Sequence, residues 1–243
     1  MISTLHYISQ ETFDKSHVEN IREACRLGID WVQLRVKDKS QDEIEEIAFE
    51  AKSICKKFGA KLIINDHVEI AKAVKANGVH LGKNDMNPIE AREILGDKPY
   101  IGGTANTWDD VVSLNRAGVD YIGLGPFKFT ETKENLSPIL GIKGYSTILN
   151  NMIISNIDTP IIAIGGITID DIFDIQMTGC HGVAVASLIN EAPNKELMVE
   201  EIKSLLPNTE FGITDHSVSN EIEDKFNDLE SNNYGTEDSG QDF

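Results

Sequence analysis

The chain has 243 residues, 40% of them hydrophobic and 26% charged, a composition typical of a globular protein with a large core. Its formal net charge of −18 argues against nucleic acid as a partner. The sequence contains neither a signal-peptide pattern nor an apolar run of about 18 residues, so we expect a cytoplasmic protein that does not enter a membrane. Cys25, Cys55 and Cys180 lack metal or disulfide spacing and are expected to be packing residues.

Short apolar runs alternate with segments of helical periodicity through the first 206 residues. The pattern predicts strands at 5–9, 31–35, 61–66, 78–82, 100–104, 121–125, 160–166 and 182–187. It predicts helices at 16–28, 41–59, 66–76, 88–95, 107–117, 142–156, 168–177 and 195–206.

This alternation predicts an α/β protein whose parallel strands are joined by right-handed crossovers. Eight units in about 200 residues favour a single (β/α)₈ TIM barrel over an open doubly wound sheet, which periodicity alone does not exclude. No G-x-G-x-x-G motif opens the first helix, so the usual sequence signal for a dinucleotide site is missing. We therefore predict a TIM-barrel catalytic domain over 1–206.

The remaining residues, 207–243, differ in composition from the barrel. They contain ten Asp or Glu and one Lys, and Asn and Ser are frequent. Such composition is typical of a flexible tail. Val218, Ile222, Phe226 and Leu229 lie at helical spacing within it, which would suit one short amphipathic helix.

Polar residues follow the predicted strands at the end where TIM barrels carry their active sites. Gln33, Arg35 and Lys37 alternate along an extended segment, so they share one face. A guanidinium fork and an ammonium both suit phosphate oxygens, although two solvated surface charges are an equally good interpretation of Arg35 and Lys37 alone.

Two carboxylates, Asp66 and Asp85, follow successive strands, the first of them directly after Asn65. One or two carboxylates with phosphate oxygens and water are the usual ligands of Mg²⁺. Taken singly, Asp66 is better explained as a helix cap and Asp85 as a turn residue. Their coincidence with the cations favours the metal site.

Later strand ends add hydroxyls and glycines. Gly165 and Gly166 follow the seventh strand, and Ala186 and Ser187 follow the eighth, where many TIM barrels bind phosphate through backbone N–H groups. A glycine pair can also be a simple turn. The fifth strand ends in Thr104, and Thr130, Thr132 and Lys133 follow the sixth. His80, inside an apolar strand, is expected to be a core histidine without a catalytic role.

Six motifs in this order and spacing closely resemble the thiamine-phosphate synthase family. They are WVQLRVK, LIINDHVEIA, GVHLGKNDM, DYIGLGPFKFTETK, PIIAIGGI and GVAVAS. The resemblance covers about residues 5–206. It implies a TIM barrel that condenses a hydroxymethylpyrimidine pyrophosphate with a thiazole phosphate, or its carboxylated form, giving thiamine phosphate and pyrophosphate.

The resemblance also implies a role for each strand-end residue. Gln33 would contact the aminopyrimidine, and Thr104 would supply a hydroxyl that the family usually takes from serine. Asp66 and Asp85 would ligate one Mg²⁺ per active site. The pyrophosphate would be held by Asn65 and by the catalytic cations Arg35, Lys37 and Lys133. The thiazole substrate would meet Thr130 and Thr132, with its phosphate on Gly166, Ala186 and Ser187.

In the mechanism that the resemblance implies, the C–O bond ionises first, and the thiazole nitrogen then captures the pyrimidine-methyl cation. A thiazole tautomerase paralogue is the nearest alternative, but Pro126 stands where such paralogues tend to carry histidine. A second alternative is a non-catalytic barrel that binds thiamine precursors and signals through its acidic tail. The sequence leaves a homo-oligomer open.

Overall fold

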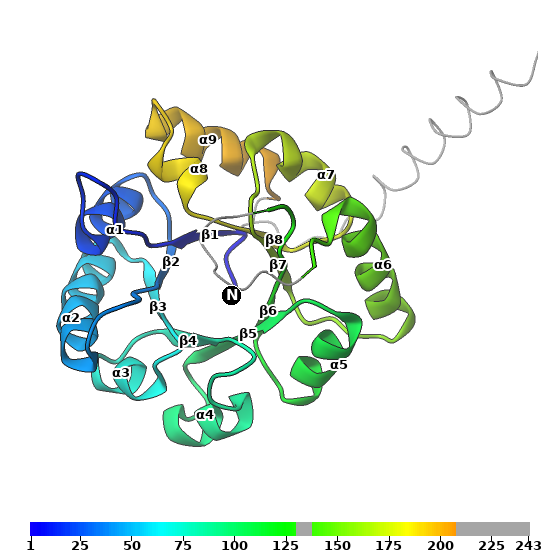
Figure 1. The fold of residues 1–243 in the computed structure, drawn as a ribbon, viewed down its shortest axis with the longest axis horizontal. Helices are drawn as coiled ribbons and strands as arrows, with labels where there is room; N and C mark the ends of the chain where they lie inside the picture. Colours follow the sequence, from blue (N-terminus) through cyan, green and yellow to red (C-terminus); the bar gives the residue numbers. More distant parts are fainter. Residues whose placement is uncertain (130–137, 208–243) are drawn as a thin grey trace, which may run out of the picture. The chain divides into compact units, whose positions relative to one another are not determined.

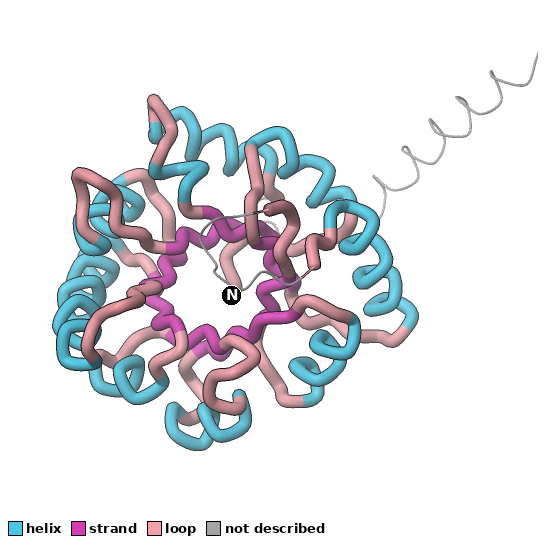
Figure 2. The backbone as a smooth tube through the Cα atoms, viewed as in Figure 1, coloured by secondary structure: helices cyan, strands magenta, loops and turns pink. Residues whose placement is uncertain are grey.

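The structure, a computed structural model, describes residues 1–129 and 138–207. Within these residues eight parallel strands pair in chain order, and β8 pairs back to β1, so the barrel is closed. Figures 1 and 2 show the strands as an inner ring with the helices around it. The predicted (β/α)₈ barrel is confirmed. The strands are β1 (Leu5–Ile8), β2 (Trp31–Leu34), β3 (Lys61–Asn65), β4 (Gly78–Leu81), β5 (Tyr100–Ala105), β6 (Tyr121–Leu124), β7 (Ile161–Ile164) and β8 (Gly182–Val185).

The helices begin where short polar side chains satisfy free backbone N–H groups. Ser16 and Ser40 form reciprocal caps with Glu19 and Glu43, and Thr107 does so with Asp110. The helices are α1 (His17–Arg26), α2 (Gln41–Phe58), α3 (Val68–Ala73), α4 (Pro88–Leu95), α5 (Trp108–Arg116), α6 (Gly141–Ile154), α7 (Ile172–Met177), α8 (Ser187–Asn190) and α9 (Lys195–Leu205), with a 3₁₀ turn, η1 (Ile169–Asp171), before α7.

Alternation along the strands divides the core into two parts. A large apolar layer lies between strands and helices and includes Tyr7 and Val32, while a smaller cluster, with Trp31 and Tyr121, fills the barrel interior. Successive residues of β2, Trp31 and Val32, thus belong to different layers. The interior is packed, so ligands have access at the ends of the strands.

The predicted elements differ from the observed ones mainly at their ends. Strand β7 stops at Ile164 because Gly165 and Gly166 turn the chain with φ of 100° and 66°. Ser187, expected at the end of a strand, is the first residue of the short helix α8. No helix among the described residues is long and apolar enough to span a bilayer.

The compact unit that holds the barrel runs from Met1 to Pro207. The predicted tail lies almost wholly outside the described residues, so its flexibility stays a prediction.

Candidate active site

The first site residues come from the ends of two neighbouring strands. Gln33 on β2 donates its side-chain amide to the Asn65 amide oxygen on β3 over 2.7 Å. Both side chains are buried. This hydrogen bond fixes the orientation of two amides beneath the mouth of the barrel, where either could recognise a heteroaromatic ring or an anion.

Arg35 follows directly after β2 and is held by the first strand as well. Its backbone N–H donates to the Ser9 hydroxyl over 3.1 Å, and Ser9 is 2.9 Å from His17 Nδ1. Burial lowers the pKa of Arg35, whereas the charge of Asp66 opposes that change. Arg35 is therefore a half-buried cation that faces a carboxylate.

A hollow of about 590 Å³ opens beside this arginine. Its lining includes Arg35, Lys37 and Asn190, together with residues of the segment after β1. Lys37 is exposed. Two cations of the predicted site thus border open space, which they share with the acidic residues Glu11, Asp14 and Glu191.

The two predicted metal ligands lie together. Burial raises the pKa of Asp66 to about 7, helped by a hydrogen bond and by charge repulsion from Asp85, and Arg35 and Lys37 act against the rise. Asp66 has φ of 65°, and its N–H donates to the His80 carbonyl over 2.9 Å. The Gly82 N–H donates to Asp85 Oδ2 over 2.6 Å. The backbone therefore holds two like charges at close range.

Such a pair suits a hard divalent cation. Both groups offer carboxylate oxygens, and a cation between them would offset the burial and the repulsion from Asp85 that raise the pKa of Asp66. The described residues contain no group of three or more His, Cys, Asp or Glu placed to bind a metal. The described residues would therefore offer two ligands, Asp66 and Asp85, and a substrate and water could supply others, which is the usual pattern for Mg²⁺.

Thr104 lies on β5 below the mouth. Its hydroxyl is 3.0 Å from His80 Nε2, and His80 Nδ1 is 3.1 Å from the Tyr121 hydroxyl. His80 is buried, as predicted for a core histidine, but it contacts a predicted substrate residue directly. Sequence patterns do not predict that contact, because it depends on how neighbouring strands place their side chains.

The ends of β7 and β8 present mainly backbone. Gly166 has a left-handed φ, and a Cβ there would lie 2.3 Å from the Phe129 carbonyl. The N–H of Lys128 donates to the Gly165 carbonyl over 2.9 Å, so the segment after β6 runs beside the glycine pair. Ala186 is half-buried and Ser187 is exposed. Only glycine fits at position 166.

Three predicted site residues, Thr130, Thr132 and Lys133, lie outside the described residues. Lys83, which stands near Asp85 in the sequence, pairs instead with Asp110 at 2.6 Å. The other residues predicted for the site lie at or just beyond the C-terminal ends of their strands.

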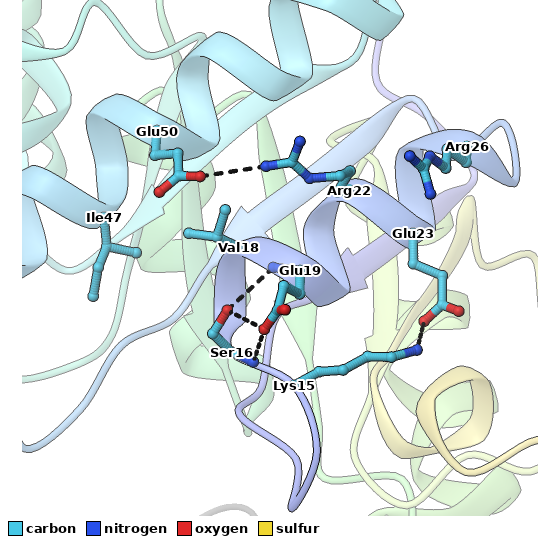
Figure 3. Close-up of a pocket in the computed structure, with 9 residues that line it drawn as sticks. All are labelled: Lys15, Ser16, Val18, Glu19, Arg22, Glu23, Arg26, Ile47 and Glu50. Atoms are coloured by element: carbon cyan, nitrogen blue, oxygen red, sulfur yellow. Dashed lines mark hydrogen bonds and ion pairs between the residues drawn. The ribbon is translucent and has the colours of Figure 1, made fainter.

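A larger hollow of about 760 Å³ lies over α1 and α2, away from those strand ends (Figure 3). Its charges are mostly paired with each other, Lys15 with Glu23 at 2.9 Å and Arg22 with Glu50 at 3.3 Å. No predicted site residue lines it. We therefore take the barrel mouth as the candidate active site.

Two residues that support the site were not predicted to belong to it. Ser9 ends up between His17 and the Arg35 backbone, and His80 lies between Thr104 and Tyr121. The available signals were the position of Ser9 at the end of a predicted strand and the polar character of His80 inside an apolar one.

Comparisons with known proteins agree on one family. A family model described as thiamine monophosphate synthase matches residues 5–189. Thiamine-phosphate synthase of Bacteroides fragilis is 47% identical over 203 residues, which are 84% of this chain and 98% of the relative. The enzyme of the same name from Flavobacterium johnsoniae is 45% identical over 85% of this chain and 97% of its own.

Solved structures give the same result. Thiamine phosphate pyrophosphorylase from Pyrococcus furiosus superposes with a TM-score of 0.72 at 28% identity, covering 83% of this chain and 94% of that one. A 3-hexulose-6-phosphate synthase superposes with a TM-score of 0.60 at 12% identity, over 84% of this chain and 100% of its own, a likeness of fold alone.

Proposed function

The chain belongs to the thiamine monophosphate synthase family, and from that membership we propose how the mouth of its barrel makes thiamine phosphate. It is a transferase of thiamine biosynthesis with the activity of a thiamine-phosphate synthase. The proposal concerns the substrates, the metal and the residues that act on them.

The electrophile is a hydroxymethylpyrimidine pyrophosphate. Gln33, already oriented by Asn65, hydrogen-bonds the aminopyrimidine and so places its methylene carbon below the mouth. Arg35, Lys37 and, from outside the described residues, Lys133 hold the pyrophosphate. The half-buried Arg35 is well suited to this task because its charge is poorly screened there.

One Mg²⁺ per active site fits the pair Asp66 and Asp85, which would hold it together with pyrophosphate oxygens. When bound, it neutralises charge that develops on the leaving group. The neighbouring cations Arg35 and Lys37 would contribute further positive charge to the same leaving group.

The thiazole phosphate, or its carboxylated form, occupies the opposite side. Its phosphate lies against the backbone N–H groups of Gly166, Ala186 and Ser187, and Thr130 and Thr132 border its ring. Backbone donors bind phosphate without adding a side chain to the crowded mouth. Phe129, which directly precedes Thr130 in the sequence, lies close to Gly166, and this supports assigning both threonines to the thiazole side.

The chemistry needs no protein nucleophile. The C–O bond breaks with its electron pair leaving on the pyrophosphate, and the aminopyrimidine stabilises the resulting methylene cation. The thiazole nitrogen then donates its lone pair to form the C–N bond. The residues of the chain contribute charge stabilisation at the leaving group and close placement of the two rings.

The single observation that carries the proposal is the meeting of Asp66, Asp85 and Arg35 at adjacent strand ends. The test is to incubate the purified protein with both precursors, with and without Mg²⁺. We expect equal amounts of thiamine phosphate and pyrophosphate, formed only with the metal. A thiazole tautomerase would isomerise the thiazole without consuming the pyrimidine, and a binding protein would consume neither.

The cellular setting is also proposed. All three cysteines are free and buried, which suits the reducing cytoplasm. The barrel domain, 1–206, would carry the whole reaction without the tail, 207–243. Every residue named in this scheme comes from one chain, so the scheme is compatible with a homo-oligomer in which each subunit has its own site.

A further inference from the structure

Three hydrogen-bonded side chains cross the barrel interior beneath the mouth. The Tyr121 hydroxyl lies 3.1 Å from His80 Nδ1, and His80 Nε2 lies 3.0 Å from Thr104 Oγ1. They come from β6, β4 and β5. Tyr121 is 1% exposed and His80 is 8% exposed, whereas Thr104 is half-buried. Both ring nitrogens of His80 are engaged, so the imidazole links the buried phenol to a predicted substrate residue.

Two glycines leave room for this ring. A Cβ at Gly102 would lie 2.6 Å from His80 Nδ1 and 2.2 Å from the Tyr121 ring, and one at Gly123 would lie 3.0 Å from His80 Cε1. Any other residue at Gly102 would displace the histidine or the tyrosine. The absence of side chains at Gly102 and Gly123 therefore leaves the space in which the imidazole contacts Thr104.

The hydrogen bonds can run in two directions, because neutral imidazole has one donor and one acceptor. If Thr104 donates to His80, its only hydrogen is used below the mouth. If His80 Nε2–H donates to Thr104, the threonine hydrogen is free to point at a ligand. Tyr121, at the other ring nitrogen, therefore bears on this direction.

The Trp31 indole packs edge-on against Tyr121 with ring centres 5.6 Å apart. Its N–H is buried and has no hydrogen-bond acceptor among the described residues. Burial raises the pKa of Tyr121, and the nearby Trp31 side chain acts against that rise. A donor-only group beside the phenol oxygen favours Tyr121 as the donor to His80 Nδ1. The proton of His80 then resides on Nε2.

We propose that His80 is a positioning residue that holds the Thr104 hydroxyl as a hydrogen-bond donor to an oxygen of the departing pyrophosphate. This rests on the proposed function, which supplies the anion. The bond strengthens as negative charge builds on the leaving oxygen, so its loss lowers kcat more than it raises the KM for the pyrimidine pyrophosphate.

The test variants each remove one hydrogen-bonding group. Thr104→Val removes the hydroxyl at nearly constant shape, and His80→Asn removes the donor that reaches it. Each is expected to lower kcat by roughly tenfold to a hundredfold, the usual effect of losing a hydrogen bond to a charged group. His80→Gln should recover part of the loss, because the Gln side-chain N–H can reach the place of Nε2–H.

The decisive experiment is a double-mutant cycle on the full-length protein. If His80 acts through Thr104, His80→Asn should have less than about a threefold effect on kcat once Thr104→Val is present. Full multiplication of the two single effects, in variants that unfold at the wild-type urea midpoint, would overturn the proposal. If His80→Asn does not fold, Tyr121→Phe takes its place in the cycle with the same expected outcome.

Tyr100→Phe provides the matched control. Tyr100 also packs on Trp31 inside the barrel, but its hydroxyl bonds to the Met1 amino group at 2.9 Å and not to His80. We expect Tyr121→Phe to lower kcat severalfold and Tyr100→Phe to leave it unchanged. Equal effects of both would contradict the inference. A wild-type protein that forms no thiamine phosphate would instead refute the proposed function itself.

Discussion

The two sides of the barrel mouth use different chemistry. The ends of β2, β3 and β4 provide charged and amide side chains, with Arg35 facing Asp66 and Asp85 beside it. The ends of β7 and β8 provide a glycine pair and the turn into α8. In the proposed mechanism, the side that stabilises a new charge does so with side chains, and the side that binds the thiazole phosphate does so with the backbone.

Electrostatics explains the difference. A leaving pyrophosphate gains charge during the reaction, so stabilising it requires full charges held in place in advance. A spectator phosphate carries the same charge before and after, and several neutral N–H groups suffice to bind it. Substitutions on the first side should therefore reduce kcat, and those on the second should raise the KM for the thiazole phosphate.

The largest effect is expected from Asp85→Ala. It removes one of two proposed metal ligands and should lower kcat by about a hundredfold or more, since stabilising groups at a developing charge are worth that much. Steady-state kinetics at saturating Mg²⁺ measures the loss. Asp97→Ala, an exposed aspartate in the loop after α4, is the control. Activity within threefold of wild type in Asp85→Ala would contradict the metal assignment.

A smaller effect, of another kind, is expected on the opposite side. Gly166→Ala forces a side chain into a left-handed backbone position and against Phe129. The KM for the thiazole phosphate should rise by about tenfold or more with kcat much less affected. Ser187→Ala, which keeps the backbone N–H, should change neither by more than a few-fold. A kcat defect in Gly166→Ala that exceeds its KM defect would argue against the division between the two sides.

The stability of the barrel should depend on pH through His6, a buried residue of β1. Burial lowers its pKa well below 6.5, so the folded protein keeps it neutral while the unfolded chain takes up a proton as the pH falls below 6.5. Stability is therefore present above that pH and is lost on acidification, by up to about 1.4 kcal/mol per pH unit.

Urea unfolding at pH 7.5 and pH 5.5 checks this. His6→Gln cannot take up that proton, so it should lose less stability between the two pH values than wild type does. Equal losses in both proteins would exclude His6 as a source of acid sensitivity.

The smallest effect is expected from removing residues 208–243. The composition of this segment does not favour a packed core, and no proposed site residue lies in it. A chain ending at Pro207 should keep kcat and both KM values within about twofold, because the truncation removes no residue proposed to stabilise the transition state. A large fall in kcat would assign the tail a part in catalysis.

Much of this arrangement was predictable from sequence because TIM barrels collect strand ends at one face. Asp66 and Asp85 were expected to meet there. They lie close to each other, since Asp85 raises the pKa of Asp66 through a hydrogen bond and through its charge. The support of Arg35 by Ser9 and His17, and the link from Tyr121 to Thr104 through His80, were not predicted. Such contacts depend on side-chain directions between strands, which periodicity does not encode. Ser187 was expected to end a strand and instead begins α8, since both states suit a short polar residue after an apolar run.

The most direct test of the account is the rate of pyrophosphate release as a function of Mg²⁺ concentration, measured with both precursors for wild type, Asp85→Ala and Ser187→Ala. We predict saturable dependence on Mg²⁺ in wild type and Ser187→Ala, and a rate near background in Asp85→Ala. Release that proceeds equally well in wild type after removal of all divalent cations would contradict the assignment of leaving-group activation to the β2–β4 side.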